Sequence, residues 1–261
     1  MQNREFMLYA YALALACAAC GGGSEASGAE TTPVAAAPST PSTGAEAPPA
    51  PEPAPVAEAE PPAPQPAPYG AVIIHKVKDY AAWKTGFDAG TDARKEASFA
   101  GHAVMRGADD QNLVLIWAPF NDEGKAKAFM DDKALKEKMK QSGVIGKPSV
   151  QLTSVVVSHM DPSAQTPAGA LVVAKVKDFA AFKNDFDSTT QARSDAGITG
   201  SSLSQDLADK NVAYVYLQSA DPAKLKSYVE AKETKAEWKT AGVTGPAKIT
   251  LVQSVEMVTY P

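Results

Sequence analysis

The sequence predicts an α+β fold in which a βαββαβ module occurs twice in tandem and the two modules pack sheet to sheet. Three observations lead to this prediction: an internal repeat at a constant offset of 99 residues, an element order shared by both copies, and central strands that are apolar on both faces. A repeat of this length is far longer than a solenoid unit, so each copy is expected to be a small domain of its own.

The repeat is carried by motifs that recur without any insertion between them. Residues 77–84 (VKDYAAWK) return as residues 176–183 (VKDFAAFK). At the same offset, Ala93-Arg94 returns as Ala192-Arg193. One module has therefore been duplicated within the chain.

The first copy begins with an apolar run rich in β-branched residues, which predicts a strand at 71–77. Asp79 then caps a helix whose apolar stripe is Tyr80, Trp83 and Phe87, at helical spacing. The remaining predicted elements are strands at 102–106 and 113–118, a helix from Asp122 that restarts near Asp132, a stop at 143–148 and a strand at 150–157.

The second copy repeats this order. Pro222 follows the capping Asp221 at the first helical position, where proline is favoured. The predicted elements are strands at 171–176, 201–205, 212–217 and 249–258, with helices over 178–196 and 221–240.

The third strand of each copy indicates what covers the sheet. Residues 113–117 (LVLIW) and 212–217 (VAYVYL) do not alternate apolar with polar side chains. A sheet with one face in water alternates, whereas a sheet covered on both faces need not. Helices cover one face, so the other copy is expected to cover the second.

The N-terminal quarter of the chain has a different composition. An apolar run at 7–19 is too short to span a bilayer and is typical of a signal-peptide core. The segment 21–68 is rich in Ala, Pro and Glu, and 13 of the 20 prolines lie in residues 1–68. Such a segment cannot bury enough apolar surface to order itself, so we expect a disordered linker.

Charge and cysteine usage bound the function. Residues 1–68 hold one base and seven acids, a net charge of −6, so the remainder of the −5 chain carries +1. A nearly neutral module pair has no basic nucleic-acid footprint, and no nucleic-acid partner is predicted. Both cysteines, Cys17 and Cys20, lie in the leader, so no disulfide is expected in the modules.

Two resemblances follow from these residues. The leader resembles a bacterial lipoprotein signal, with Ala18-Ala19-Cys20 before glycines; Cys20 is the implied lipidation site and Cys17 the alternative. Residues 77–148, and more loosely the second copy, resemble the dimeric α/β-barrel superfamily of ferredoxin-like modules, which includes antibiotic-biosynthesis monooxygenase-like domains. This resemblance implies a pseudo-dimeric barrel within one chain and hence a monomer.

These results predict five segments and an envelope location. The segments are a signal peptide at 1–20, the linker 21–68, a first module at 69–160, a short linker at 161–168 and a second module at 169–261. The lipid anchor would attach the protein to the cell envelope. By resemblance, Gly21 after Cys20 favours the outer membrane, facing the periplasm or the cell surface.

Three histidines and two arginines are candidates for chemistry. His75 and His102 fall on first-copy strands and are replaced by Ala174 and Ser201 in the second copy, while His159 lies at the last strand. No spacing typical of a metal site accompanies them, so no metal is predicted. An ordinary structural role is one interpretation, and a haem or ligand contact from His75 or His102 is the alternative.

Arg94 and Arg193 continue the inward helix stripe through Thr91 and Thr190. They could face a cleft between helices and sheet and bind a carboxylate or phenolate. Alternatively, each meets the negative end of the helix dipole and covers apolar surface. The aromatic candidates for this cleft are Trp83, Trp117, Tyr214 and Tyr216, which are equally interpretable as core.

Three classes of function remain open. The first is a lipid-anchored envelope protein that binds a small molecule or has a structural role, without catalysis and without a cofactor. The second is a cofactor-independent monooxygenase-like or haem-using enzyme acting on a small aromatic or apolar compound, with Arg94, His75 or His102 as catalytic candidates. The third is a partner-docking assembly protein. An open cleft would favour the second class, and filled clefts a structural role.

Overall fold

The computed structural model describes residues 69–160 and 168–261. The predicted signal peptide with Cys17 and Cys20, the linker 21–68 and all but the last residue of the predicted linker 161–168 lie outside these residues. Within the described residues, no helix is long and apolar enough to cross a membrane.

Each module contains four strands and four short helices. The first comprises β1 (Tyr69–Val77), α1 (Tyr80–Asp88), α2 (Thr91–Glu96), β2 (Gly101–Gly107), β3 (Leu113–Phe120), α3 (Glu123–Asp131), α4 (Lys133–Gln141) and β4 (Val144–His159). The second comprises β5 (Ala168–Lys175), α5 (Phe179–Ser188), α6 (Thr190–Asp195), β6 (Gly200–Asp206), β7 (Val212–Ser219), α7 (Pro222–Glu230), α8 (Lys232–Thr240) and β8 (Lys248–Thr259).

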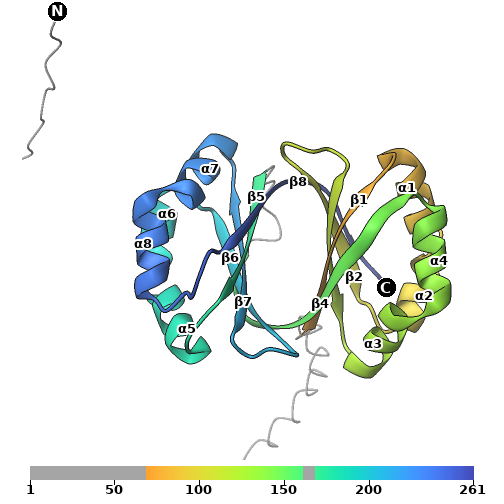
Figure 1. Ribbon diagram of the computed structural model, residues 1–261, viewed down its shortest axis with the longest axis horizontal. Coiled ribbons are helices and arrows are strands. Elements are labelled where there is room, and N and C mark those ends of the chain that lie inside the picture. The colour runs from red at the N-terminus through yellow and green to blue at the C-terminus, as the bar shows by residue number, and fades with distance from the viewer. Residues whose placement is uncertain (1–68, 161–167) are drawn as a thin grey trace, which may run out of the picture. The chain divides into compact units, whose positions relative to one another are not determined.

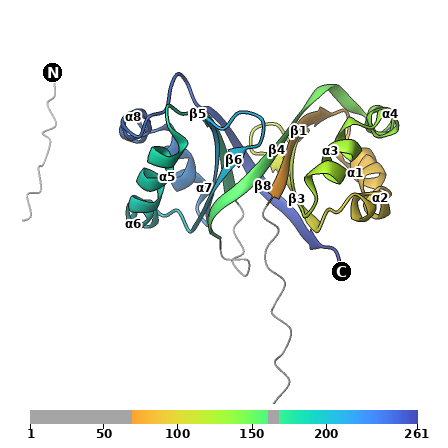
Figure 2. The same cartoon turned by 90° about the horizontal axis from the view of Figure 1, so that it is seen from below.

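The strands form one closed antiparallel barrel in the order β1-β3-β2-β8-β5-β7-β6-β4. The last strand of each module crosses to the other module: β4 pairs with β1 and then β6, while β8 pairs with β5 and then β2. Figure 1 shows α1–α4 and α5–α8 on opposite outer sides of the barrel, and Figure 2 shows the same arrangement from below. The predicted fold class is confirmed.

The inner face of the barrel is a shared apolar core. It contains Val72, Ala103, Met105 and Leu115 from the first module, and Leu171, Tyr214 and Val252 from the second. Each module also has a core of its own between sheet and helices. The central strands are therefore buried on both faces, as their uninterrupted apolar runs predicted.

Local signals in the sequence account for where the helices begin. The side chains of Asp79 and Asp178 accept hydrogen bonds from the backbone N–H groups of Ala82 (2.7 Å) and Ala181 (2.9 Å). These contacts satisfy one of the N–H groups that every helix start leaves without an intrahelical partner. Pro222 occupies the first turn of α7, as predicted.

Two boundaries differ from the prediction. The first helix of each module ends early and restarts, so Thr91 and Arg94 lie on α2 rather than on a continuation of α1. The break frees the carbonyl of Phe87, which accepts a hydrogen bond from Nη1 of Arg94 at 2.7 Å. Gly143 (φ 88°) ends α4 as predicted, but β4 begins directly at Val144.

Candidate functional site

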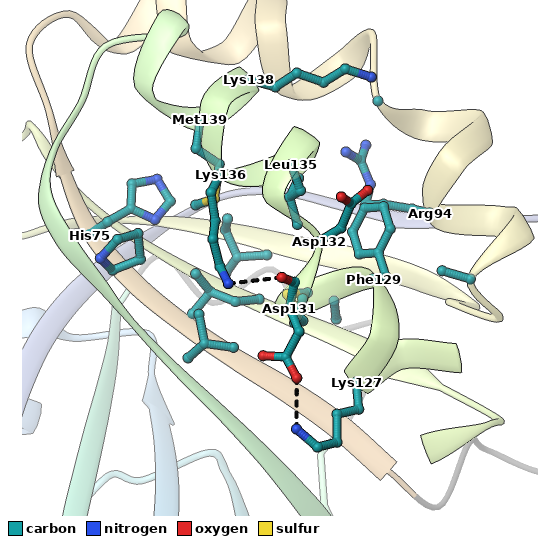
Figure 3. A pocket seen from close by; sticks show the side chains of 18 of the residues that line it. His75, Arg94, Lys127, Phe129, Asp131, Asp132, Leu135, Lys136, Lys138 and Met139 are labelled. Carbon is teal, nitrogen blue, oxygen red and sulfur yellow. Dashed lines mark hydrogen bonds and ion pairs between the residues drawn. The ribbon is translucent and has the colours of Figure 1, made fainter. Parts of the chain in front are cut away.

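The two modules differ most in the space between their helices and sheet. In the first module this space is a hollow of about 2020 Å³, whereas its counterpart in the second measures about 400 Å³. The larger hollow, called the first cleft below, lies between β1, β3 and β4 on one side and α3 and α4 on the other (Figure 3). The smaller one is called the second cleft.

Side-chain size at equivalent positions accounts for this difference. Among the residues that line the clefts, the second module has the half-buried Trp238 where the first has Met139. In the buried core beside each cleft, the second module has Leu225 where the first has Ala126. No residue of α4 is buried, while the equivalent α8 buries Thr234. The first module therefore lacks the apolar volume that fills the second.

His75 lies on the wall of the first cleft without any hydrogen-bond partner for either ring nitrogen among the described residues. The side chain is 4% exposed and packs 5.5 Å from the ring of Trp83, centroid to centroid. Burial lowers the pKa of His75 to about 4, so the imidazole is neutral at pH 7. A buried polar group with no partner carries a desolvation penalty that a ligand can relieve.

Arg94 also lines the first cleft, and each of its three nitrogen atoms donates a hydrogen bond within the protein. Nε donates to the hydroxyl of Tyr260 at 2.7 Å and Nη2 to Oγ1 of Thr91 at 3.1 Å, in addition to the Phe87 carbonyl. The guanidinium lies over the Phe87 ring, 3.9 Å from its centroid. Arg94 therefore uses three of its five N–H groups, including Nε, to support the cleft wall.

Tyr260 links Arg94 to His102. The tyrosine hydroxyl lies 2.8 Å from Nδ1 of His102. Because the hydroxyl accepts from Arg94, its own proton is available to Nδ1, which leaves the ring proton on Nε2. That nitrogen lies 3.1 Å from Oε1 of Glu256, which also pairs with Lys84. Burial is the largest influence on His102 and lowers its pKa.

Arg193 occupies the equivalent place in the second cleft with a different set of contacts. Nη1 and Nη2 donate to the hydroxyls of Thr189 (2.8 Å) and Thr190 (3.1 Å). Nε is buried without a hydrogen-bond partner among the described residues. Burial lowers the pKa of Arg193 from its ordinary value.

The other predicted aromatic residues lie elsewhere. Trp117, Tyr214 and Tyr216 belong to the core inside the barrel, on the sheet face away from the helices, and do not line either helix–sheet cleft. Trp117 packs against Gly70 and Tyr216 against Gly169, where a β-carbon would collide with each ring. Burial raises the pKa of Tyr216 to about 12.

The predicted site residues thus form separate groups. Trp83, His75 and Arg94 share the first cleft, and Arg193 lines the second. His102 is tied to the C-terminal strand, and His159 is exposed at the end of β4. Within residues 69–160 and 168–261, no group of three His, Cys, Asp or Glu residues could hold a metal ion.

Sequence reasoning missed Tyr260, Glu256 and the difference between Ala126 and Leu225. The last of these could have been predicted from the sequence, because aligning the two copies at the 99-residue offset places a small residue in the first copy at the position of a large one in the second. Tyr260 and Glu256 carry no local signal. They reach the first module only because β8 crosses to pair with β2.

Comparison with known proteins places the fold. No sequence-family model and no curated protein matches this chain. A Fusobacterium nucleatum subsp. nucleatum ATCC 25586 protein to which monooxygenase activity has been attributed is similar in structure, with a TM-score of 0.53 at 14% identity, covering 74% of this chain and 95% of that chain.

Two further solved structures agree. An anthrone oxidase-like protein has a TM-score of 0.54 at 11% identity, with coverage of 73% of this chain and 92% of that chain. A Lactobacillus acidophilus NCFM protein, again with an attributed monooxygenase activity, has a TM-score of 0.50 at 11% identity, covering 74% of this chain and 96% of that chain. At these identities the likeness establishes the fold, a tandem pair of ferredoxin-like modules.

Proposed function

We propose that the first cleft binds a small aromatic or apolar compound and carries out an oxygenase-type reaction on it. The observation that carries this proposal is the difference between the two clefts: only the first module combines a large apolar hollow with a buried, uncommitted imidazole, that of His75. Enzyme sites are typically apolar clefts with a few convergent polar groups. The monooxygenase and anthrone oxidase-like names attached to proteins of the same fold favour an enzyme over a purely structural role.

The reaction class follows from what the cleft provides. Its inner wall is apolar and aromatic, and the imidazole of His75 is neutral and can accept a proton from a ligand. An activated methylene group could then be converted to a carbonyl by O₂. One oxygen atom would enter the product and the other would leave as water, so no external reductant is needed.

We propose that a ligand reaches His75 through a movement of α4. Both ring nitrogens are shielded from solvent, and α4 faces the sheet across the cleft without a single buried side chain. Figure 3 shows Leu135 and Met139 of this helix on the cleft side. A helix anchored so weakly is the element that can shift to admit a ligand.

A thermal-melting screen tests the proposal. We expect a phenol or quinone to raise the melting midpoint of the full chain with increasing concentration, because a ligand that binds only the folded state stabilises it. Met139→Trp should abolish the shift by filling the first cleft as Trp238 fills the second. A positive compound would then be assayed for O₂ consumption, and His75→Gln should abolish turnover. A flat response, or an unchanged response in Met139→Trp, would exclude the proposal.

Haem is included in the same screen. His75 would be the residue to hold haem, because neither of its ring nitrogens has another partner among the described residues. Haem would supply oxygen activation at iron, with His75 holding it. A haem absorption band that depends on His75 would replace the cofactor-independent reaction with a haem-dependent one.

We further propose that the protein is a lipid-anchored monomer of the cell envelope, at the outer membrane facing the periplasm or the cell surface. The signal-like leader and the Ala/Pro/Glu-rich segment after Cys20 support this proposal. Mass spectrometry of the mature N-terminus should find a lipid on Cys20, absent after Cys20→Ser. Unchanged lipidation in that variant would assign Cys17 instead, and an unmodified N-terminus would exclude the anchor.

Gel filtration tests the monomeric state and should show one chain per particle.

A further inference from the structure

We propose that the second cleft is a separate binding site for a small aromatic or apolar carboxylate, held by the guanidinium of Arg193. This site is independent of the proposed function of the first cleft, because it uses other residues in the other module.

The first argument is the state of Arg193 itself. The side chain is 5% exposed and lines the second cleft. Asp185 and Asp187 act on the charge of Arg193 only as more distant neighbours, no salt bridge to a carboxylate is formed among the described residues, and its Nε has no acceptor. A buried cation without an anionic partner is unfavourable, and a bound carboxylate would supply the missing charge.

The second argument is the comparison with Arg94. The two arginines are equivalent in the repeat, and each lies 3.9 Å over the ring of the equivalent phenylalanine, Phe87 or Phe186. In the first module the Tyr260 hydroxyl accepts from Nε of Arg94. The first module thus shows that an oxygen atom fits at this position. We place one ligand oxygen at the corresponding position beside Nε of Arg193.

The shape and lining of the second cleft limit the ligand. A volume of about 400 Å³ suits a molecule the size of one aromatic ring with a short substituent. The walls include Phe182, Phe186, Tyr228 and Trp238, which favour an aromatic or apolar body. Nε is shielded from solvent, so the ligand oxygen reaches it after the half-buried side chains of Tyr228 and Trp238 shift.

Neighbouring acids set the selectivity for a single negative charge. Asp185 and Glu237 line the cleft, and Asp187 is held by Lys183 at 2.6 Å. These carboxylates would repel a dianion more strongly than a monoanion. The inferred class is therefore a monocarboxylate with an apolar body.

Benzoate is the probe and its neutral isostere benzamide the control. Trp238 lines the second cleft and reports on it, whereas Trp83 lines the first. We expect benzoate to change the tryptophan fluorescence of the full chain in a saturable manner. The change should disappear in Trp238→Phe and persist in Trp83→Phe. Benzamide should bind at least tenfold more weakly, because it lacks the charge that pairs with Arg193.

Three variants identify the residues responsible. Arg193→Met should abolish benzoate binding, while Arg94→Met, its equivalent in the first module, should not change it. Ala236→Phe, at an exposed position of α8 that lines the second cleft, should block binding without touching Arg193 and serves where Arg193→Met fails to fold. The proposal is overturned if benzoate does not bind, if benzamide binds as tightly, or if Ala236→Phe binds benzoate normally.

Discussion

The two modules share one fold and the aspartate caps of α1 and α5 and of α3 and α7, yet their helix–sheet spaces differ. The second module fills this space with Leu225 and Trp238 and retains only a small cleft. The first has smaller or more flexible residues at these positions and retains the large cleft with His75 on its wall. The two copies of one module therefore differ in how completely side chains fill the space between helices and sheet.

The largest effect on stability is expected from truncating Leu225, which is buried in the core of the second module. Leu225→Ala should destabilise the protein by about 3 kcal/mol, because Leu225 is 1% exposed and its loss leaves a cavity. Met139→Trp in the first module should change stability by less than about 1 kcal/mol, since Met139 lines the open hollow, which accommodates the added atoms. Urea unfolding measures both variants. Equal destabilisation by the two would show that the clefts are packed alike.

His75 should make stability depend on pH. Its pKa is about 4 in the folded protein and its ordinary value is 6.5, so between these values the unfolded chain binds a proton that the folded protein does not. Stability is therefore complete above about pH 6.5 and should fall by about 3 kcal/mol as the pH is lowered to 4.

The matched variant is His75→Gln, which does not titrate. The difference in unfolding free energy between wild type and this variant should shrink or reverse as the pH falls from 6.5 to 4. The second module has Ala174 at the equivalent strand position and contributes nothing to this difference. Parallel pH profiles for the two proteins would contradict the lowered pKa.

Tyr260 should stabilise the first module by connecting it to the C-terminal strand. Tyr260→Phe removes the hydroxyl that accepts from Arg94 and contacts His102, which leaves buried polar atoms without a partner. We expect a loss of about 2 kcal/mol. In a double-mutant cycle with Arg94→Met, the two losses should not add, because both variants break the same hydrogen bond. Additive losses would mean that the two side chains act independently.

The smallest effect on stability is expected at the ion pair between Lys84 and Glu256. Nζ of Lys84 lies 3.1 Å from Oε1 of Glu256, and each side chain is about one-quarter exposed or less. Glu256→Gln should lower the free energy of unfolding by less than about 1 kcal/mol, and the difference in stability between wild type and variant should decrease in high salt. Thermal melting at two salt concentrations measures it. A large effect that is independent of salt would assign Glu256 a role in holding His102 instead.

Much of the fold was predictable because the relevant signals are local. Asp79, Asp122, Asp178 and Asp221 each begin a helix, as their positions before apolar stripes predicted. The apolar runs of β3 and β7 correctly indicated sheets covered on both faces. The helix breaks near Gly90 and Thr189 were not predicted, because the apolar stripe continues through them in the sequence.

The candidate sites were less predictable because they depend on contacts between distant segments. Arg94 was a candidate for ligand binding, but its Nε donates a hydrogen bond to the hydroxyl of Tyr260, which lies 166 residues later in the chain. Arg193 has the same sequence context and keeps its Nε free of partners in the described residues. Trp117, Tyr214 and Tyr216 were candidates for a cleft, but strand orientation directs them into the barrel.

By itself, the sequence determined the duplication, the order of the elements and the need for each sheet to be covered on both faces, because repeats, helix caps and apolar periodicity act over a few residues. Only the tertiary structure decided that β4 and β8 exchange between modules, that one cleft is open and the other nearly filled, and which of two equivalent arginines is satisfied. Those outcomes depend on how side chains far apart in the chain fill a shared volume and share hydrogen-bond partners, which no local pattern specifies.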